Sequence, residues 1–517
     1  MGVYSGTFLL RLILNTLVLA SLAWGQARPD KLTLQEALES TISLHPQARI
    51  REQQVAASRG ALREASGIFD PFYSSGLQQS FAPTPLTTRQ QDPTGPKSAA
   101  VNFTSFSAAS RRLYRNGITA GPIVELDRAR DRLANIAGIN RSRLAYEMTI
   151  PLLRNRGPDV VAAGERSAGV QVEASRFDLN QSFTDLLSNT AVSYWELTGA
   201  LRLLEVAASS EARATMILEN VDDLIKADRI PQNDIHQVRA NLAERVAGRV
   251  AASQQVVVAR QQLALAVGVP PEAIASIPDP AEGLPEVTSP EDKPEVMRRY
   301  IELALTQRSD YLAARKRTEA ERAFLAQAKN GLLPNVELTL SSGYSGLSEG
   351  AASFFTSPVQ GVRGVDAVAG LRYGFAPRNN IAAGRLAQTE AAIQQAEWRA
   401  AAVARQISSE VVVALAGVRN AALRLGKARE SVAAYQSALD GEREKYRRGF
   451  GSLVDILTIE ERLTGSLAVV VLAQIDAAVE LAHLRQATGT LVAPDALAPR
   501  ADRVAFLTLP ELKGSTP

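Results

Sequence analysis

The feature that most constrains this 517-residue chain is an internal repeat. The segment SLHPQARIREQQVAASRGALREASGIFDPFY, which begins at Ser43, aligns without a gap with TQRSDYLAARKRTEAERAFLAQAKNGLLPNVE, which begins at Thr306. A second alignment pairs Asp234 with Asp455 and Leu263 with Leu484, at an offset of 221 residues instead of 263. Repeats on this scale usually mean that one architecture is built twice. We therefore expect two homologous halves.

The two offsets differ because the segment between the helices is longer in the first half than in the second.

The first residues predict a secretory signal, since the apolar run LILNTLVLASLAW is too short to span a membrane and small residues follow it. No later uninterrupted apolar run predicts a membrane-spanning helix. The expected organisation is a signal peptide at 1–27, a first half at 28–268 with strands and loops at about 71–157 and a helical hairpin at about 158–267, a Pro-rich linker at 269–295, a second half at 296–489 with strands at about 334–376 and a helical hairpin at about 378–488, and a C-terminal tail at 490–517.

Two short segments in each half alternate between apolar and polar residues, which predicts strands with one apolar face. The weakest contains Tyr73, Leu77 and Phe81, and the pattern of residues 83–142 predicts no definite structure. Four strands separated by long helices make a poor independent core, and an open sheet cannot face lipid with bare edges. Closure must therefore come from other copies of the chain. The candidates for a lipid-facing surface are Leu144, Tyr146, Met148, Ile150, Val336, Leu338, Leu340, Leu371, Tyr373 and Phe375.

Heptads predict two antiparallel coiled-coil hairpins, one in each half. In the second half, a long proline-free segment from about 378 to 446 is followed by a Gly-containing break and a shorter return segment. The first half repeats this plan, with a turn in KADRIPQND. The predicted seam residues of the second half are Ile407, Val411, Ala414, Val418, Ala421, Leu425, Ala428, Val432, Tyr435, Leu439 and Tyr446, continued by Ile456, Leu463, Val470, Ala477 and Leu484.

Composition argues against several classes of function. The chain has no cysteine, which excludes disulfides, thiolate metal sites and a cysteine nucleophile. The 57 Lys and Arg nearly balance the 54 Asp and Glu, and both signs are interleaved along the helical segments, so no nucleic-acid partner is expected. The three histidines lie far apart, and no motif predicts a phosphate loop or a metal cluster. We expect neither an enzyme nor a cofactor.

The order of these segments resembles that of the TolC-type outer membrane efflux proteins. The likeness rests on LTLQEALESTISLHP, MTIPLLRNRG, LRYGFAPRNNIAAGRLAQTEAAI, KYRRGFGSLVDILTIEERL and LRQATGTL, although Ile150 stands where the family commonly has Gln. The resemblance implies a mainly α fold with two strand pairs per chain. It implies a homotrimer whose 12-stranded barrel crosses the outer membrane and continues into an α-barrel tunnel in the periplasm. It also implies a periplasmic adaptor (membrane fusion) protein, an inner-membrane pump of RND or ABC type, contact with outer membrane lipid, and no cofactor.

The resemblance also assigns roles at the periplasmic tips of the hairpins. Asp234 and Asp455 align with aspartates that narrow the pore, and Tyr446 aligns with a gate-region Tyr. A charged ring at a constriction selects ions or acts as a gate. The alternative is an ordinary helix N-cap or a solvated face. The tip turns are assigned to Gly449 and Gly451, and to Pro231.

Part of the family's gate does not transfer, because Gly451 and Thr458 stand where some relatives place a gate-locking Arg and a second Asp. Two further functions stay open on sequence grounds. One is a type I protein secretion outlet of the same fold. The other is a coiled-coil stalk that conducts nothing. The sequence does not identify the exported substrate.

Overall fold

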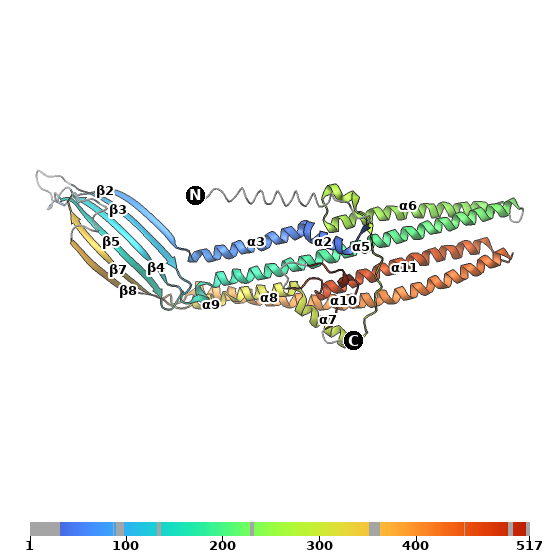
Figure 1. Ribbon diagram of the computed structural model, residues 1–517. Coiled ribbons are helices and arrows are strands. Elements are labelled where there is room, and N and C mark those ends of the chain that lie inside the picture. Colours follow the sequence, from blue (N-terminus) through green and yellow to red (C-terminus); the bar gives the residue numbers. More distant parts are fainter. Residues whose placement is uncertain are drawn as a thin grey trace. The chain divides into compact units, whose positions relative to one another are not determined.

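The computed structural model describes residues 31–85, 87–88, 98–131, 136–227, 232–350, 362–448, 450–494 and 500–512 (Figure 1). Its α-helices are α2 (Leu34–Leu44), α3 (Pro46–Ser66), α4 (Pro158–Val161), α5 (Ala163–Lys226), α6 (Asp234–Val267), α7 (Pro294–Gln307), α8 (Ser309–Arg322), α9 (Leu325–Asn330), α10 (Asn380–Arg447) and α11 (Leu453–Thr488). Its strands are β1 (Lys31–Leu32), β2 (Phe72–Pro85), β3 (Ser98–Leu113), β4 (Thr119–Asp131), β5 (Ile136–Pro151), β6 (Asp279–Pro280), β7 (Asn335–Glu349) and β8 (Val362–Gly374).

Two compact units cut across the order of the chain. Unit 1 comprises the described residues within 1–54, 176–313 and 401–517, and it contains most of the long helices. Unit 2 comprises the described residues within 55–175 and 314–400, and it contains the large sheet. The same sequence of short helices, strands, a long helix and a shorter return helix occurs twice along the chain.

The sheet of unit 2 has six antiparallel strands in the order β2-β3-β4-β5-β7-β8. The expectation of two strand pairs per chain was therefore wrong, because the first half supplies four strands. The additional hairpin is β3 and β4, which falls in the segment whose pattern predicted no definite structure. These residues form strands because they hydrogen-bond to neighbouring strands on both sides, even though apolar and polar residues alternate only weakly along them.

The helices of unit 1 confirm the predicted seam. Along α10, the heptad positions Val411, Val418 and Leu439 are fully buried. On α11, Leu463, Ala477 and Leu484 are buried in the same way. Small residues let the helices approach closely: a Cβ at Gly199 of α5 would overlap the Ile475 side chain of α11.

The largest core of unit 1 joins segments from both ends of the chain. Tyr194 and Trp195 of α5 are fully buried in it, with their rings edge to face at a centroid distance of 5.1 Å. The Tyr194 hydroxyl donates to the Leu32 carbonyl (3.0 Å). Leu32 lies in β1, which pairs in parallel with β6 of the Pro-rich linker. This core therefore fixes the linker and the N-terminal described residues against α5.

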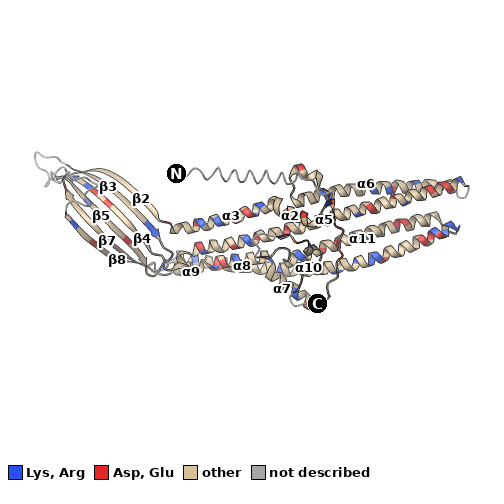
Figure 2. Cartoon of the chain, viewed as in Figure 1, with Lys and Arg blue, Asp and Glu red and all other residues tan. Residues whose placement is uncertain are grey.

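By length and composition, α10 and α11 each contain a stretch that is apolar enough to cross a membrane. Both helices also carry interleaved charges (Figure 2). Arg424 of α10 and Asp476 of α11 form an ion pair between the helices. Ion pairs between helices are typical of coiled coils.

Candidate functional site

The two predicted gate aspartates occupy the first turns of the two return helices. Asp234 is the first residue of α6 and is half-buried, and Asp455 lies in the first turn of α11 and is exposed. Carboxylates near a helix N-terminus are stabilised by the helix dipole. The actual N-cap of α11 is Ser452, whose hydroxyl accepts from the Val454 amide at 3.2 Å. The N-cap alternative is therefore wrong for Asp455, and both carboxylates lie where the helix dipole favours a negative charge.

Tyr446 lies where the two hairpins meet. It packs at the edge of one buried cluster formed by Val221, Val238, Leu453 and Leu457, and of a second around Leu439. Burial raises the pKa of its hydroxyl, and the negative charge of Asp234 raises it further. Tyr446 of α10 therefore lies in the electrostatic field of α6, and it is also a seam residue, as predicted.

The tip turn of the second hairpin needs a small residue at position 451. A Cβ at Gly451 would lie 2.7 Å from the backbone nitrogen of Tyr446 and 3.0 Å from its Cα. Real side chains essentially never approach backbone so closely, so the turn requires glycine here. Gly449 and Pro231, the other residues assigned to the tip turns, lie outside the described residues.

A buried ion cluster that the sequence analysis missed joins the two hairpins near these tips. Glu460 of α11 is 3% exposed and accepts from Arg213 of α5. Arg443 of α10 approaches the second carboxylate oxygen at 3.4 Å, and Arg213 also donates to Thr464 at 3.1 Å. Glu460 falls at seam spacing between Ile456 and Leu463, so a charged residue at an apolar position was the available signal.

The register of the sheet places the predicted lipid-facing residues on one face. Directly opposite residues in antiparallel strands share a face. Leu144, Met148 and Ile150 of β5 lie opposite Tyr344, Leu340 and Leu338 of β7, respectively. Leu338 lies opposite Leu371 and Val336 lies opposite Tyr373. Tyr146 shares this surface, which we call the apolar face, and Phe375 follows the end of β8.

Charged side chains on the apolar face are confined to the ends of the described strands. Arg112 lies near the end of β3, Arg128 and Arg130 near the end of β4, and Arg363 near the start of β8. An uncharged band separates the two ends. An apolar band between charged ends is the outward pattern of a membrane strand.

The opposite face of the sheet, which we call the charged face, carries an ion network at its centre. Arg143 of β5 donates to Asp366 of β8 at 3.0 Å and to Ser341 of β7 at 2.7 Å. Its guanidinium also lies 3.8 Å from Glu125 of β4 and 3.7 Å from Glu147. One arginine thus bridges four strands. The sheet consequently has one surface suited to lipid and one suited to water.

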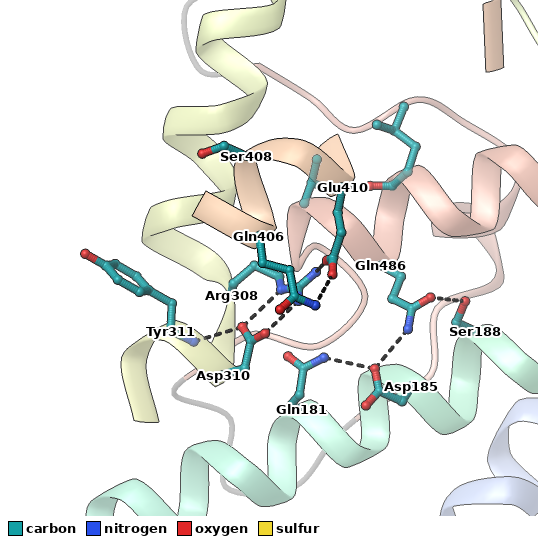
Figure 3. A network of polar contacts seen from close by, with 12 residues as sticks. Gln181, Asp185, Ser188, Arg308, Asp310, Tyr311, Gln406, Ser408, Glu410 and Gln486 are labelled. Carbon is teal, nitrogen blue, oxygen red and sulfur yellow. Dashed lines mark hydrogen bonds and ion pairs between the residues drawn. The ribbon is translucent and has the colours of Figure 1, made fainter. Parts of the chain in front are cut away.

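A second polar network in unit 1 connects helices of both halves (Figure 3). Arg308, at the junction of α7 and α8, donates to both carboxylate oxygens of Asp310 at 3.0 and 2.6 Å, and to Glu410 of α10 at 2.8 Å. Asp185 of α5 accepts from Gln486 of α11 at 2.9 Å. Burial raises the pKa of the Asp185 carboxyl, and the hydrogen bond from Gln486 opposes that shift. These residues line an open cavity of about 720 Å³.

The polar contacts of this network connect neighbouring helices. Arg308 is 6% exposed, and two carboxylates compensate its buried charge. Within the described residues, no group of three or more His, Asp or Glu side chains has the geometry to hold a metal ion. Arg308 therefore connects the α7–α8 junction to α10, and Gln486 separately connects α11 to α5.

Comparisons with known proteins agree with this geometry. Residues 300–490 match the family model of the outer membrane efflux proteins. The chain is 23% identical over 376 residues to the outer membrane protein TolC of Escherichia coli, covering 71% of this chain and 73% of TolC. Its fold matches the outer-membrane channel OprN with a TM-score of 0.64 at 17% identity, covering 88% of this chain and 89% of OprN. It matches VceC of Vibrio cholerae with a TM-score of 0.61 at 19% identity, covering 88% and 96%.

The family model covers the second half, where the long α10, its return helix α11 and the strands β7 and β8 lie. The match to TolC extends beyond that half, and the structural matches extend over most of the chain. The described helical hairpins and the sheet with one apolar face are the parts of the molecule that such a fold requires. The second half of the chain thus matches the outer membrane efflux protein family, and most of the chain has the fold of the solved channels OprN and VceC.

Proposed function

We propose that copies of this chain assemble as a homotrimer whose sheets close a β-barrel in the outer membrane and whose helices enclose a tunnel in the periplasm. The assembly conducts solutes passively from the periplasm to the exterior. The observation that carries this proposal is the sheet of unit 2. It has one apolar face, one charged face, and two outer strands without a described partner on their far sides.

The outer strands support assembly because they leave both backbone groups and apolar side chains uncovered. Leu77 on β2 is 75% exposed, and Val365 on β8 is 79% exposed. In a membrane each unpaired backbone group costs several kcal/mol, roughly, so strands span lipid only as closed barrels. A neighbouring copy supplies the missing partner for each outer strand.

The helices of unit 1 have an unsatisfied surface of their own. On α6, Val250, Val257 and Leu265 recur at nearly heptad spacing and are 55%, 48% and 66% exposed. This second stripe faces away from the residues that α6 buries, such as Leu263 and Val267. Exposed apolar residues that recur at heptad spacing on a helix are a site for packing another helix. In the trimer, a helix of the adjacent copy covers it.

The tips set the properties of the conduit. Around a three-fold axis, Asp234 and Asp455 would form rings of up to six carboxylates, which would favour cations or hold the tip closed. As in the efflux proteins that the chain resembles, the tunnel works with a periplasmic adaptor protein and an inner-membrane pump of RND or ABC type. In this proposal the pump selects the substrate.

Two measurements test the proposal. Cell fractionation should place the protein in the outer membrane as a trimer that dissociates on heating. In a planar lipid bilayer the purified trimer should give discrete conductance steps. A soluble monomer would contradict the barrel, and a trimer that never conducts would favour a structural stalk.

A further inference from the structure

The number of strands that each copy brings to the membrane follows from the sheet itself. We infer that the barrel formed by three copies has eighteen strands, six from each chain, and that the β3–β4 hairpin is part of its wall. This inference rests on the proposed function, since it needs three copies and a closed barrel. It goes beyond the 12-stranded barrel that the resemblance implied.

All six strands are long enough to cross a membrane. They contain 13 to 16 residues each, and a tilted membrane strand needs about 9–11. This holds for β3 (16 residues) and β4 (13 residues) as much as for the four strands expected from sequence. Both β3 and β4 are therefore long enough to be strands of the barrel wall.

Near the middle of the sheet, the division into two faces continues across the β3–β4 hairpin. One row across all six strands on the apolar face is Ser75, Ala108, Val124, Leu144, Tyr344 and Val365. The adjacent row on the charged face is Gly76, Ser107, Glu125, Arg143, Ser345 and Gly364. Val124 continues the apolar row and Glu125 continues the charged row, so the distinction between the two faces extends to β4 at this position.

The turn of the β3–β4 hairpin is held by contacts within unit 2. The turn between β3 and β4 packs on the segment that follows β5, where the Gly157 amide donates to the Asn116 carbonyl at 3.0 Å. Arg115 donates to both carboxylate oxygens of Glu165 at 2.7 and 2.6 Å. At Gly117, φ is +95° and a Cβ would clash with the Asn155 backbone, so only glycine lets the turn approach this segment so closely. These contacts hold β3 and β4 in line with the other strands.

A barrel with six strands per copy keeps all neighbouring strands antiparallel, including the two that meet between copies. Five successive antiparallel pairings make β8 run opposite to β2, so β8 of one copy can pair with β2 of the next. Their lengths match, at 13 and 14 residues. The apolar residues are odd-numbered on both strands, as with Leu77 and Val365, and the register must therefore pair odd with odd.

Barrel diameter grows roughly linearly with strand number, so eighteen strands give a barrel about 1.5 times as wide as twelve. Barrels of 16–18 strands leave an aqueous channel. The outer part of the conduit would then admit larger solutes than a 12-stranded barrel, and the constriction would lie at the helix tips.

Single-cysteine variants test whether β4 lies in the wall. The chain has no cysteine, so each variant carries one thiol. Val124→Cys and Ile123→Cys place a bimane label on opposite faces of β4, and Leu144→Cys and Ala145→Cys do the same on β5. In bilayers with bromine on the lipid tails, we expect at least fivefold stronger lipid quenching at position 124 than at 123, matching the ratio between 144 and 145.

The outcomes separate the inference from the proposed function. Lipid quenching at 144 but not at 124 would remove β3 and β4 from the wall while leaving a membrane barrel. No lipid quenching at either position would overturn the barrel itself. Electron cryomicroscopy of the assembly in nanodiscs should count eighteen strands. A count of twelve, from two copies or from an excluded hairpin, would overturn the inference.

Discussion

Neutralising Glu460 should loosen the contact between the two helical hairpins. In the Glu460→Gln variant the shape of the side chain is kept, but Arg213 loses its buried counter-charge. Glu460 has 4% of its side chain exposed and Arg213 has 18%, so little water can replace the lost partner. Removing one member of a buried pair costs about 3–5 kcal/mol. Because Arg213 keeps some exposure and Arg443 is farther away, we expect about 3 kcal/mol, near the lower end of that range.

Hydrogen exchange measures this loss locally, because protection of the amides in α11 reports the free energy of opening that segment. A loss of about 3 kcal/mol corresponds to roughly 100-fold faster exchange around position 460. Glu461→Gln is the matched control, since Glu461 is exposed on the same helix turn. Exchange in the Glu460→Gln variant within about threefold of the control would refute the reasoning. Replacing both partners, as Arg213→Met with Glu460→Leu, should restore most of the protection, because the apolar pair leaves only Arg443 without its partner and that side chain is 39% exposed.

Three further predictions concern packing, conduction and pH. Gly199→Ala should lower the temperature of trimer dissociation by overpacking the α5–α11 contact, at a cost of about 1–3 kcal/mol, whereas Gly248→Ala, which enters open space, should not. Replacing Asp234 and Asp455 with Ala should raise single-channel conductance and weaken block by multivalent cations; unchanged channels would remove them from the gate. Burial raises the pKa of Tyr194 from 10.0 to about 12, so the Tyr194 hydroxyl loses its proton at lower pH in the unfolded chain than in the folded one. Stability should therefore fall as pH rises between these two values. In the Tyr194→Phe variant, the thermal midpoint should decline less over this pH range.

Sequence periodicity predicted the helices well because apolar residues are buried at the same heptad positions over many turns. Along α10, positions such as Val411 and Leu439 are each buried by the same partner surface, so single exceptions do not hide the pattern. The strands β5, β7 and β8 were also predicted, since residues such as Leu144 and Leu371 contrast with charged neighbours. These features are local, and they are visible in one chain without its partners.

The β3–β4 hairpin was missed because its strands lack that contrast. On β3, Val101 and Phe103 lie on the charged face and Phe106 lies on the apolar face, so apolar residues occur on both sides. On β4, the pair Gly121–Pro122 reads as a turn signal. The ladder to β3 is in fact interrupted there, between the pairs at Ile123 and at Ala120. Only pairing with β2 on one side and β5 on the other makes the hairpin part of the sheet.

The two units place separate conditions on the number of copies. In unit 2, β2 and β8 run in opposite directions, so any number of copies keeps the antiparallel order and the sheet alone does not fix it. In the proposed assembly, the exposed α6 residues of unit 1 pack on a neighbouring copy, and this fit would set the angle between successive copies. Because one chain carries both surfaces, the number of copies that closes the helices would also set the number of strands. The β3–β4 hairpin would therefore widen the proposed barrel without reducing the number of copies.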